Sequence, residues 1–395
     1  MLGVCGGIAA YKSVELLRLL KEAGHSVTVV PTENALKFVG AATFEALSGE
    51  PVATTVWTGV DKVRHIDIGA SADIVVIAPA TADFIARASH GIASDLLTNT
   101  LLSTTAPVVL SPAMHTQMWE HPATQRNVSL LRQRGYLVID PDVGRLTGED
   151  SGVGRLPSPQ ALSDQVESVL LAKPQGLLHR HIVITAGGTR ESWDPVRYLG
   201  NRSSGKQGVA LARAAMAQGA RVTLIVGAIE TYLPAGATVI QVDSAAHMME
   251  AVRIAMKEEP DALIMAAAVA DYRPLRATDG KIKKGLGIPT LELALNEDIL
   301  ATVTQENPDT VVIGFAAETV SSHEQLLELG RIKLKAKGCT ALVLNNVSGG
   351  EIFGRNDTEI TILDRQGSAQ TIAGTKIYAA HAVVTHLSGL LSPIE

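Results

Sequence analysis

Residues Gly3–Lys12 read GVCGGIAAYK, which is a short apolar run, a glycine-rich turn and the start of a helical pattern. In a strand–turn–helix unit of this kind, backbone N–H groups and the helix dipole converge where a phosphate group can sit. The spacing is not GxGxxG, so a tight turn without a ligand stays an alternative. The stretch predicts an α/β fold.

The rest of the chain repeats this alternation of short β-branched runs and longer segments with helical periodicity. Such alternation is typical of a parallel sheet that is covered by helices. In the first half we predict strands at 26–30, 74–78, 108–110 and 137–139, and helices at 8–23, 82–88 and 123–134.

A domain boundary is expected within LAKPQGLLHRH, residues 171–181, where Pro174 and Gly176 interrupt the pattern. The length of 395 residues favours two domains, which we place at 1–175 and 176–395. The second half restarts the same alternation. There we predict strands at 182–185, 222–226, 262–265, 311–315 and 341–344, and helices at 204–218 and 324–336.

Composition and charge exclude several classes of protein. Lys and Arg number 34 against 40 Asp and Glu, a net charge of −6, so no basic field attracts nucleic acid. The most apolar stretch, 262–270, is far shorter than the roughly twenty residues that cross a bilayer. The two cysteines, Cys5 and Cys339, are too few for a disulfide framework. We expect a soluble cytoplasmic protein that binds neither nucleic acid nor membrane.

Polar side chains follow the predicted strands of the first half, at the edge where open α/β sheets bind ligands. Thr32 follows the second strand, Thr81 ends APAT after the third, and SPAMHTQMW follows the fourth. His65 precedes the third strand, and a histidine suits proton transfer near neutral pH. The alternatives are helix capping by Thr32, a surface position for His65, and core packing by Met114 and Met118.

In the second half, Gly200–Lys206 read GNRSSGK, which resembles a P-loop. The next residue is Gln207, where a P-loop needs Ser or Thr, and no strand directly precedes the stretch, so that interpretation fails. A turn that binds anions at a helix start remains, with a simple helix cap as the alternative. The basic run KIKK from Lys281 is, by itself, most simply a solvated loop.

Together these motifs resemble known families. GGIAAYK, RHIDIG, APATADFIAR, PAMHTQMW and GVGR resemble flavin-dependent cysteine decarboxylases. TAGGTRESWDPVRYLGNRSSGKQG, AAAVADYRP, KIKK and GFAAET resemble phosphopantothenate–cysteine ligase. Both sets occur in this order in the bifunctional coenzyme A biosynthesis enzymes of bacteria. The resemblance covers nearly the whole chain and implies two doubly wound domains, a flavodoxin-like flavoprotein followed by a Rossmann-like ligase.

For the first half, the resemblance implies FMN bound to a flavodoxin-like domain at a trimer interface. His65 matches the histidine that helps to oxidise the cysteinyl thiol of phosphopantothenoylcysteine, after which loss of carbon dioxide is easy because the thioaldehyde delocalises the carbanion. Met118 and His115 match substrate-binding positions. The flavin positions correspond to Gly6, Gly7, Ile8, Ala9, Thr32, Ala78 and Thr81.

This chain departs from the decarboxylase pattern at two positions. His115 stands where the family usually has an Asn that holds the substrate carboxylate, and a histidine can still donate a hydrogen bond. Thr147 stands near the place of a cysteine that protonates the ene-thiol intermediate. A hydroxyl is a far weaker acid than a thiol, so the proton donor is unassigned. Cys5, in the flavin turn, is expected to be a packed small residue.

For the second half, the resemblance implies that CTP and Mg²⁺ convert phosphopantothenate into an acyl-cytidylate, which the amine of cysteine then attacks. Asn201 and Lys281 match catalytic positions that stabilise acyl and phosphoryl charge, Arg197 helps to orient Asn201, and Asp271 matches a nucleotide and metal position. The remaining CTP positions correspond to Ala267, Ala268, Glu297, Asp298, Ile299, Leu300, Phe315, Lys333 and Lys337.

Two alternatives to the bifunctional enzyme follow from the same residues. Thr147 and His115 allow a protein in which only the ligase is active. The second alternative is a regulatory subunit that binds flavin. The relatives of that class have an acidic tail, which the end LSGLLSPIE lacks, and this argues against that alternative. The resemblance also implies a homo-oligomer, with trimers of the flavin half and dimers of the ligase half that could close into a dodecamer. The first strand has only about four residues, which suggests a natural start upstream.

Overall fold

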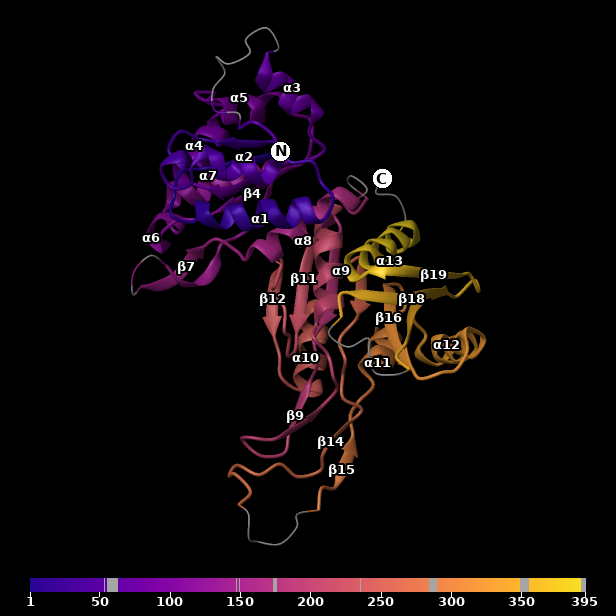
Figure 1. Cartoon of the computed structure of the whole chain (residues 1–395). Coiled ribbons are helices and arrows are strands. Elements are labelled where there is room, and N and C mark those ends of the chain that lie inside the picture. Colours follow the sequence, from indigo (N-terminus) through magenta and orange to yellow (C-terminus); the bar gives the residue numbers. More distant parts are fainter. Residues whose placement is uncertain are drawn as a thin grey trace. The chain divides into compact units, whose positions relative to one another are not determined.

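The computed structural model describes residues 1–52, 54, 63–146, 148, 150–172, 176–234, 236–283, 290–348 and 355–391. The chain divides into two compact units, Met1–Leu170 and Leu171–Glu395, which Figure 1 colours from indigo to magenta and from magenta to yellow. The predicted boundary between 175 and 176 falls just after this division.

Unit 1 contains a five-stranded parallel sheet with the order β2-β1-β3-β4-β5. Because β1 pairs with β2 on one side and β3 on the other, the strand order reverses between β1 and β3, and this is the switch point at which such sheets bind ligands. All four predicted strand regions overlap observed strands. The strands are β1 (Leu2–Val4), β2 (Val29–Pro31), β3 (Val75–Ala80), β4 (Val108–Pro112) and β5 (Leu137–Val138).

Helices cover this sheet because each strand is followed by a segment with one apolar stripe. Phe44, Phe84 and Leu131 are fully buried beneath them. A hairpin of β6 (Asp142–Arg145) and β7 (Ser151–Arg155) follows the last strand. The helices are α1 (Ala10–Glu22), the 3₁₀ turn η1 (Ala35–Lys37), α2 (Ala41–Ser48), α3 (Arg64–Ser71), α4 (Ala82–His90), α5 (Leu96–Ser103), α6 (Thr116–Trp119), α7 (Pro122–Gln133) and α8 (Pro159–Leu171).

Unit 2 contains an eight-stranded sheet with the order β12-β11-β8-β13-β16-β17-β18-β19. Its first six strands run parallel, whereas β18 and β19 add in antiparallel fashion at one edge. The sheet is therefore mixed, and its switch point lies between β8 and β13. The strands are β8 (His181–Ala186), β11 (Arg221–Val226), β12 (Thr238–Gln241), β13 (Ala262–Met265), β16 (Val311–Glu318), β17 (Ala341–Asn346), β18 (Asp357–Asp364) and β19 (Ala369–Thr375).

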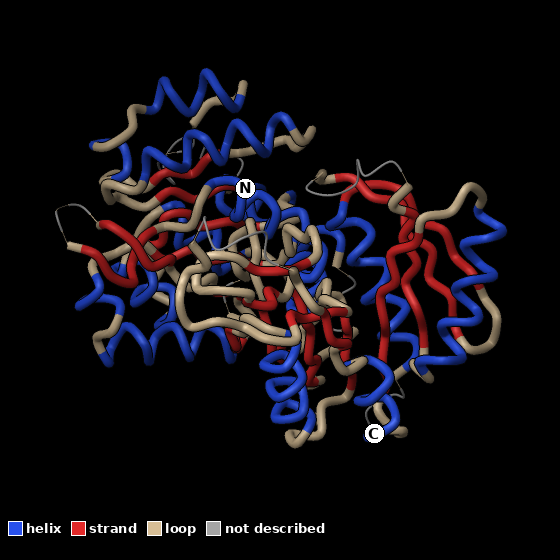
Figure 2. The backbone as a smooth tube through the Cα atoms, turned by 90° about the horizontal axis from the view of Figure 1, so that it is seen from below, coloured by secondary structure: helices blue, strands red, loops and turns tan. Residues whose placement is uncertain are grey.

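Alternation along β8 divides the core of unit 2 into two layers. Ile182 and Ile184 join one buried cluster, while Val183 between them joins the other. Each such aliphatic side chain contributes about 1.5–3 kcal/mol when fully buried. Figure 2 shows helices on both sides of the strands in this unit. They are α9 (Lys206–Ala217), α10 (Ala245–Met256), α11 (Ile299–Glu306), α12 (His323–Lys337) and α13 (Lys376–Leu390).

Two short antiparallel pairs extend from the sheet of unit 2 (Figure 1). One pairs β9 (Arg190–Ser192) with β10 (Tyr198–Gly200). The other pairs β14 (Tyr272–Pro274) with β15 (Leu293–Leu295). No helix within the described part of the chain has the length and apolarity that a bilayer crossing requires.

Candidate functional sites at two sheet edges

The switch point of unit 1 brings three of its strand ends together. The N–H of Cys5 donates to the carbonyl of Pro79 at 3.2 Å, and the N–H of Thr32 donates to the carbonyl of Val4 at 2.9 Å. A side chain at Gly7 would lie 4.0 Å from the methyl group of Thr81. The glycine turn, Thr32 and Thr81 therefore share one edge of the sheet, as the sequence predicts.

Gly6 is required by the close approach of a neighbouring turn. A Cβ atom there would lie 2.4 Å from the Cβ of Asn34 and 2.7 Å from its carbonyl carbon, closer than real contacts allow. Ala9 then caps α1 without a side-chain hydrogen bond, so the first N–H groups of this 13-residue helix lack a capping side chain. The arrangement suits a phosphate group because backbone N–H groups and the positive end of the helix dipole coincide.

Thr32 and Thr81 also have the local roles that the capping alternative predicts. The Oγ1 of Thr81 accepts from the N–H of Phe84 at the start of α4, and that of Thr32 accepts from the N–H of Ala35, both at 3.3 Å. Each hydroxyl keeps its hydrogen to donate to a ligand. Ala78 lies deeper, fully buried in β3, with its carbonyl accepting from Ser13.

Large apolar side chains are exposed on the segments that follow these strands. Ile8 is 59% exposed and Met118 is 48% exposed, and Tyr11 and Phe38 are exposed as well. Core packing is therefore wrong for Met118, while Met114 does pack against the buried cluster. Exposed apolar groups beside a polar edge are typical of a binding surface, and they fit a flat aromatic ring.

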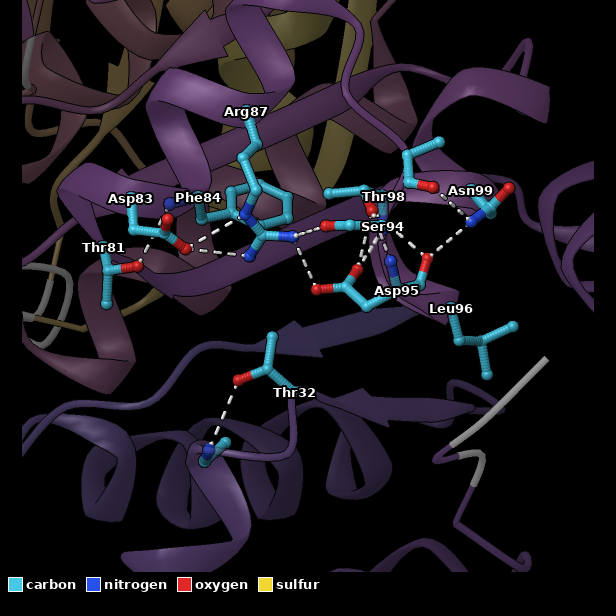
Figure 3. A network of polar contacts seen from close by, with 12 residues as sticks. Thr32, Thr81, Asp83, Phe84, Arg87, Ser94, Asp95, Leu96, Thr98 and Asn99 are labelled. Carbon is cyan, nitrogen blue, oxygen red and sulfur yellow. Dashed lines mark hydrogen bonds and ion pairs between the residues drawn. The ribbon is translucent and has the colours of Figure 1, made fainter. Parts of the chain in front are cut away.

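An ion-pair network that the sequence analysis missed braces the helices behind this edge (Figure 3). Arg87 on α4 pairs with Asp83 one turn earlier and reaches Asp95 at 2.7 Å, where Asp95 caps α5 in a capping box with Thr98. Burial acts to raise the pKa of Asp95, but the N–H of Thr98 and the Arg87 guanidinium hold that pKa below its ordinary value. The i, i+4 spacing of Asp83 and Arg87 is the signal that could have revealed it.

His65 lies on α3, which packs against α5. The backbone carbonyl of His65 accepts from Ser103 on α5 at 2.9 Å, and Gly69 packs against the same serine. Among the described residues, no hydrogen bond or ion pair joins His65 to the glycine turn, Thr32 or Thr81.

His115 meets a carboxylate from the hairpin that follows the sheet. Its Nδ1 lies 3.1 Å from Oδ2 of Asp150, which the sequence analysis did not single out. Met114 donates its N–H to the carbonyl of Gly154 at 3.0 Å, so the turn and the hairpin are joined by backbone as well. Thr147 lies outside the described residues.

The switch point of unit 2 is built from backbone contacts between β8 and β13. The N–H of Ala268 donates to the carbonyl of Gly187 at 2.8 Å, and Ala267 donates to Oγ1 of Thr185 at 3.1 Å. Gly187 adopts a φ of +80°, and a Cβ there would lie 2.5 Å from the carbonyl oxygen of Ala228. Ala267 and Ala268 therefore lie directly beyond the carboxyl end of β13, at the switch point of the sheet.

Asn201 joins this edge through its side chain. Its Nδ2 donates to the carbonyl of Val269 at 2.8 Å, which fixes the amide beside the Ala267–Val269 segment. The helix expected from residue 204 begins at Lys206 in α9, because Gly205, with a φ of +72°, turns the chain first. No side chain caps α9, so its N-terminus suits an anion.

A buried carboxylate, Asp194, connects Arg197 with the segment of Lys281. Its oxygens accept from the N–H groups of Val196 and Arg197, from the Arg197 guanidinium at 2.6 Å, and from the N–H of Ile282 at 3.3 Å. Burial acts to raise the pKa of Asp194, but these N–H groups and the guanidinium hold it below its ordinary value. Lys281 itself is exposed.

The predicted nucleotide positions divide into packed and charged groups. Ile299 is buried, and Leu300 fills the space beside Gly314 on β16, the strand that carries Phe315. The charged positions are engaged with one another or with neighbours. Asp298 caps α11 and pairs with Lys337, Lys333 pairs with Glu318, and Glu297 pairs with Arg253.

Asp271 is exposed at the start of the β14 segment, where its carbonyl accepts from the N–H of Asn296 at 2.8 Å. No group of three or more potential metal-ligating side chains occurs in the part of the chain that the structure describes. Mg²⁺ is commonly held by one or two carboxylates together with substrate phosphates, so a lone carboxylate fits such a site.

Two protein families match the two units. The family described as "Flavoprotein" matches residues 1–171, and that described as "DNA/pantothenate metabolism flavoprotein C-terminal domain" matches residues 177–390. The "Coenzyme A biosynthesis bifunctional protein CoaBC" of Mycobacterium tuberculosis (strain ATCC 25618 / H37Rv) is 49% identical over 410 residues, covering 99% of this chain and 97% of the relative. The chain belongs to the CoaBC family.

Other CoaBC proteins match over nearly the same length. The Bacillus subtilis protein is 42% identical, covering 93% of this chain and 90% of its own. The Vibrio cholerae protein is also 42% identical, covering 97% and 96%. The family assignment confirms the predicted α/β class, the flavoprotein first half and the bifunctional enzyme of coenzyme A biosynthesis.

Proposed function

We propose that the chain catalyses two consecutive reactions. Unit 2 ligates cysteine to 4′-phosphopantothenate, using CTP and Mg²⁺ and passing through an acyl-cytidylate with release of pyrophosphate. Unit 1 uses FMN to decarboxylate the product, phosphopantothenoylcysteine, to 4′-phosphopantetheine. One observation supports the proposal most strongly. In each unit, a glycine-containing turn and the start of a helix without a capping side chain lie at the switch point of the sheet.

In unit 1, FMN would supply a hydride acceptor for the cysteinyl side chain and return the hydride after carbon dioxide has left. The turn Gly6–Ala9 and the start of α1 would bind its phosphate, with Thr32 and Thr81 donating hydroxyl hydrogens. Ile8 and Met118 provide apolar surface for the ring. His65 would take the proton of the substrate thiol, and His115 would bind the substrate carboxylate.

In unit 2, Asn201 would bind the acyl-cytidylate, since its amide is already fixed beside the switch point. Lys281 would stabilise the negative charge that develops on the phosphoryl oxygens, and Asp194 holds Arg197 and the Lys281 segment together for this task. Lys333 and Lys337 would exchange their carboxylate partners for the triphosphate, while Asp271 would bind Mg²⁺.

We further propose a cytoplasmic homo-oligomer in which unit 1 forms trimers and unit 2 forms dimers, with a dodecamer as the closed assembly. A second copy would complete the flavin site, because within one chain no described hydrogen bond or ion pair joins His65 to the glycine turn, Thr32 or Thr81. The projecting β-pairs expose Val196, Tyr198, Tyr272, Leu293 and Leu295, an apolar surface that suits a partner copy. Light scattering of the full chain and of each unit tests these states.

The test of function uses the purified full chain with phosphopantothenate, cysteine, CTP, Mg²⁺ and FMN, and weighs the products by mass spectrometry. Phosphopantetheine is the expected product. Accumulation of phosphopantothenoylcysteine would restrict the activity to the ligase. A protein that binds FMN and forms neither product would support the regulatory subunit instead.

A further inference from the structure

The pair of His115 and Asp150 is a fixed feature of unit 1. Besides facing His115, Asp150 accepts the N–H of Gly148 on Oδ1 at 3.2 Å, and its carbonyl accepts the N–H of Leu146 at 3.0 Å. The hairpin also packs closely on α6, since a Cβ at Gly152 would lie 2.3 Å from Oγ1 of Thr116. These contacts hold the carboxylate in place against the imidazole.

The imidazole is at the same time accessible to a ligand. His115 precedes α6, its side chain makes no capping hydrogen bond, and that side chain is 49% exposed. A carboxylate against Nδ1 favours the ring form that carries its proton there. The opposite nitrogen, Nε2, is then the one that can exchange a proton with a substrate.

The reaction proposed for unit 1 needs an acid at a defined carbon. Oxidation turns the cysteinyl CH₂–SH into a thioaldehyde, and loss of carbon dioxide leaves an ene-thiolate, N–CH=CH–S⁻. Return of the hydride first requires a proton on the carbon that has lost the carboxylate. Both described cysteines are buried, and burial raises the pKa of the Cys339 thiol and raises that of the Cys5 thiol to about 12, so neither is a suitable acid.

We propose that His115 is the catalytic acid of the flavin half and that Asp150 is its positioning residue. This inference rests on the decarboxylase activity proposed above. The imidazolium first binds the substrate carboxylate through Nε2–H. When that carboxylate departs as carbon dioxide, the same N–H faces the carbon that must be protonated.

The step is balanced with the groups that the reaction already provides. The Nε2–H bond breaks, a C–H bond forms at the former carboxylate-bearing carbon, and the ene-thiolate becomes N–CH₂–CH=S. The hydride removed from the substrate in the first step then adds to the thioaldehyde carbon, giving N–CH₂–CH₂–S⁻. Neutral His115 regains its proton from solvent, which its exposure allows.

The first test replaces His115 by Asn, which keeps a hydrogen-bond donor for the carboxylate and removes the acid. Phosphopantothenoylcysteine should still lose carbon dioxide, but the saturated product should form at least about a hundredfold more slowly. The ene-thiol product, lighter by two hydrogens, should accumulate and be seen by mass spectrometry. His115→Gln, with the same amide on a longer side chain, is the second variant should H115N fold poorly.

The second test concerns Asp150 and includes a readout that is independent of turnover. In flavin-free protein, NMR of the imidazole nitrogens should show Nδ1 protonated in the wild type and a changed tautomer ratio in Asp150→Asn. The same variant should form saturated product roughly tenfold more slowly with an unchanged KM for phosphopantothenoylcysteine. Asp150→Glu should recover part of that loss.

The matched control is the other histidine–carboxylate pair of unit 1, between His25 and Glu167. His25→Asn and Glu167→Gln should leave the ratio of saturated to ene-thiol product unchanged. If H115N and H115Q both give saturated product at the wild-type rate, His115 is not the acid. If the wild type itself releases no carbon dioxide from phosphopantothenoylcysteine, the decarboxylase proposal fails instead.

Discussion

The two units place their candidate sites at the same point of the same kind of sheet, but they complete these sites differently. In unit 1, turns that directly follow β1, β2, β3 and β4 supply the glycine turn, Thr32, Thr81 and His115, whereas His65 comes from α3, and the Arg87 network braces the helices behind these turns. In unit 2, the strand ends supply little besides backbone, and the charged side chains come from the segments around β9, β10 and β14, from the start of α11 and from α12. In both units, backbone N–H groups at the sheet edge are suited to bind an anion. The side chains that would take part in each reaction come from the segments attached to that edge.

A second difference lies in how polar side chains are held. Asp95 and Arg87 in unit 1 pair across two helices behind the site, whereas Asp194 in unit 2 lies directly beside Arg197 and the Lys281 segment. Loss of the first pair should therefore affect stability, and loss of the second should affect catalysis.

Lys281→Gln should reduce ligation by at least about a hundredfold, because the charge that stabilises the phosphoryl oxygens is removed. Decarboxylation of added phosphopantothenoylcysteine should be unchanged. Both rates are measured by mass spectrometry of the products. Full ligase activity in this variant would refute the role of Lys281.

Gly6→Ala should abolish stable FMN binding and leave the ligase active. The new Cβ would overlap Asn34, which displaces the turn and destabilises unit 1 by about 1–3 kcal/mol. Flavin fluorescence and thermal unfolding measure the two effects. Gly40→Ala is the control, since a Cβ there meets nothing within 4 Å and the residue has an ordinary φ of −64°. Equal FMN affinity in G6A and wild type would contradict the proposal that the turn at Gly6 binds FMN.

Asp194→Asn should lower the rate of ligation roughly tenfold. The amide can accept fewer of the N–H groups that surround it and no longer pairs with the Arg197 charge, so Ile282 and Lys281 lose their anchor. Asp261→Asn, at the opposite end of β8 and β13, is a control that also removes an Arg–carboxylate pair. Similar losses of ligation in both variants would indicate a general effect on folding.

The stability of unit 1 should fall in acid through Asp95. Its pKa is lower in the folded chain than the ordinary value of about 3.9, so its contribution is fully present above that value and is lost as pH falls through the folded pKa. Thermal unfolding followed by flavin release, from pH 6 down to about pH 3, measures it. Asp95→Asn should be less stable at pH 6 and depend less on pH. Parallel curves for both proteins would contradict this role.

Much of the fold follows from local sequence patterns. Runs such as Ile182–Thr185 are β-branched and buried on both faces, which gives a strong signal for a central parallel strand. The pairs β9–β10 and β14–β15 were missed because each strand has three residues and no clear periodicity. The partners in β14 and β15 are also separated by a long stretch of chain, so no turn signal joins them.

In the candidate sites, too, some residues could be predicted from the sequence and others could not. Gly6, Thr32, Thr81, Ala267 and Ala268 could be placed at the sheet edges because strand ends and glycine turns are visible in the sequence. The positions of Asp150 and Asp194 could not be predicted in this way. Asp150 contacts His115 and Asp194 accepts the N–H of Ile282, and only folding brings these residues together. His65 has the opposite problem, because its motif is clear but no described hydrogen bond or ion pair joins it to the other predicted residues.

The most direct test of two separate sites in one chain offers two starting substrates to the variants G6A and K281Q. One reaction starts from phosphopantothenate, cysteine and CTP, and the other from phosphopantothenoylcysteine, with products weighed in both. We predict that G6A stops at phosphopantothenoylcysteine, while K281Q makes phosphopantetheine only from the second substrate. A single substitution that abolishes both reactions in a folded protein would contradict the account.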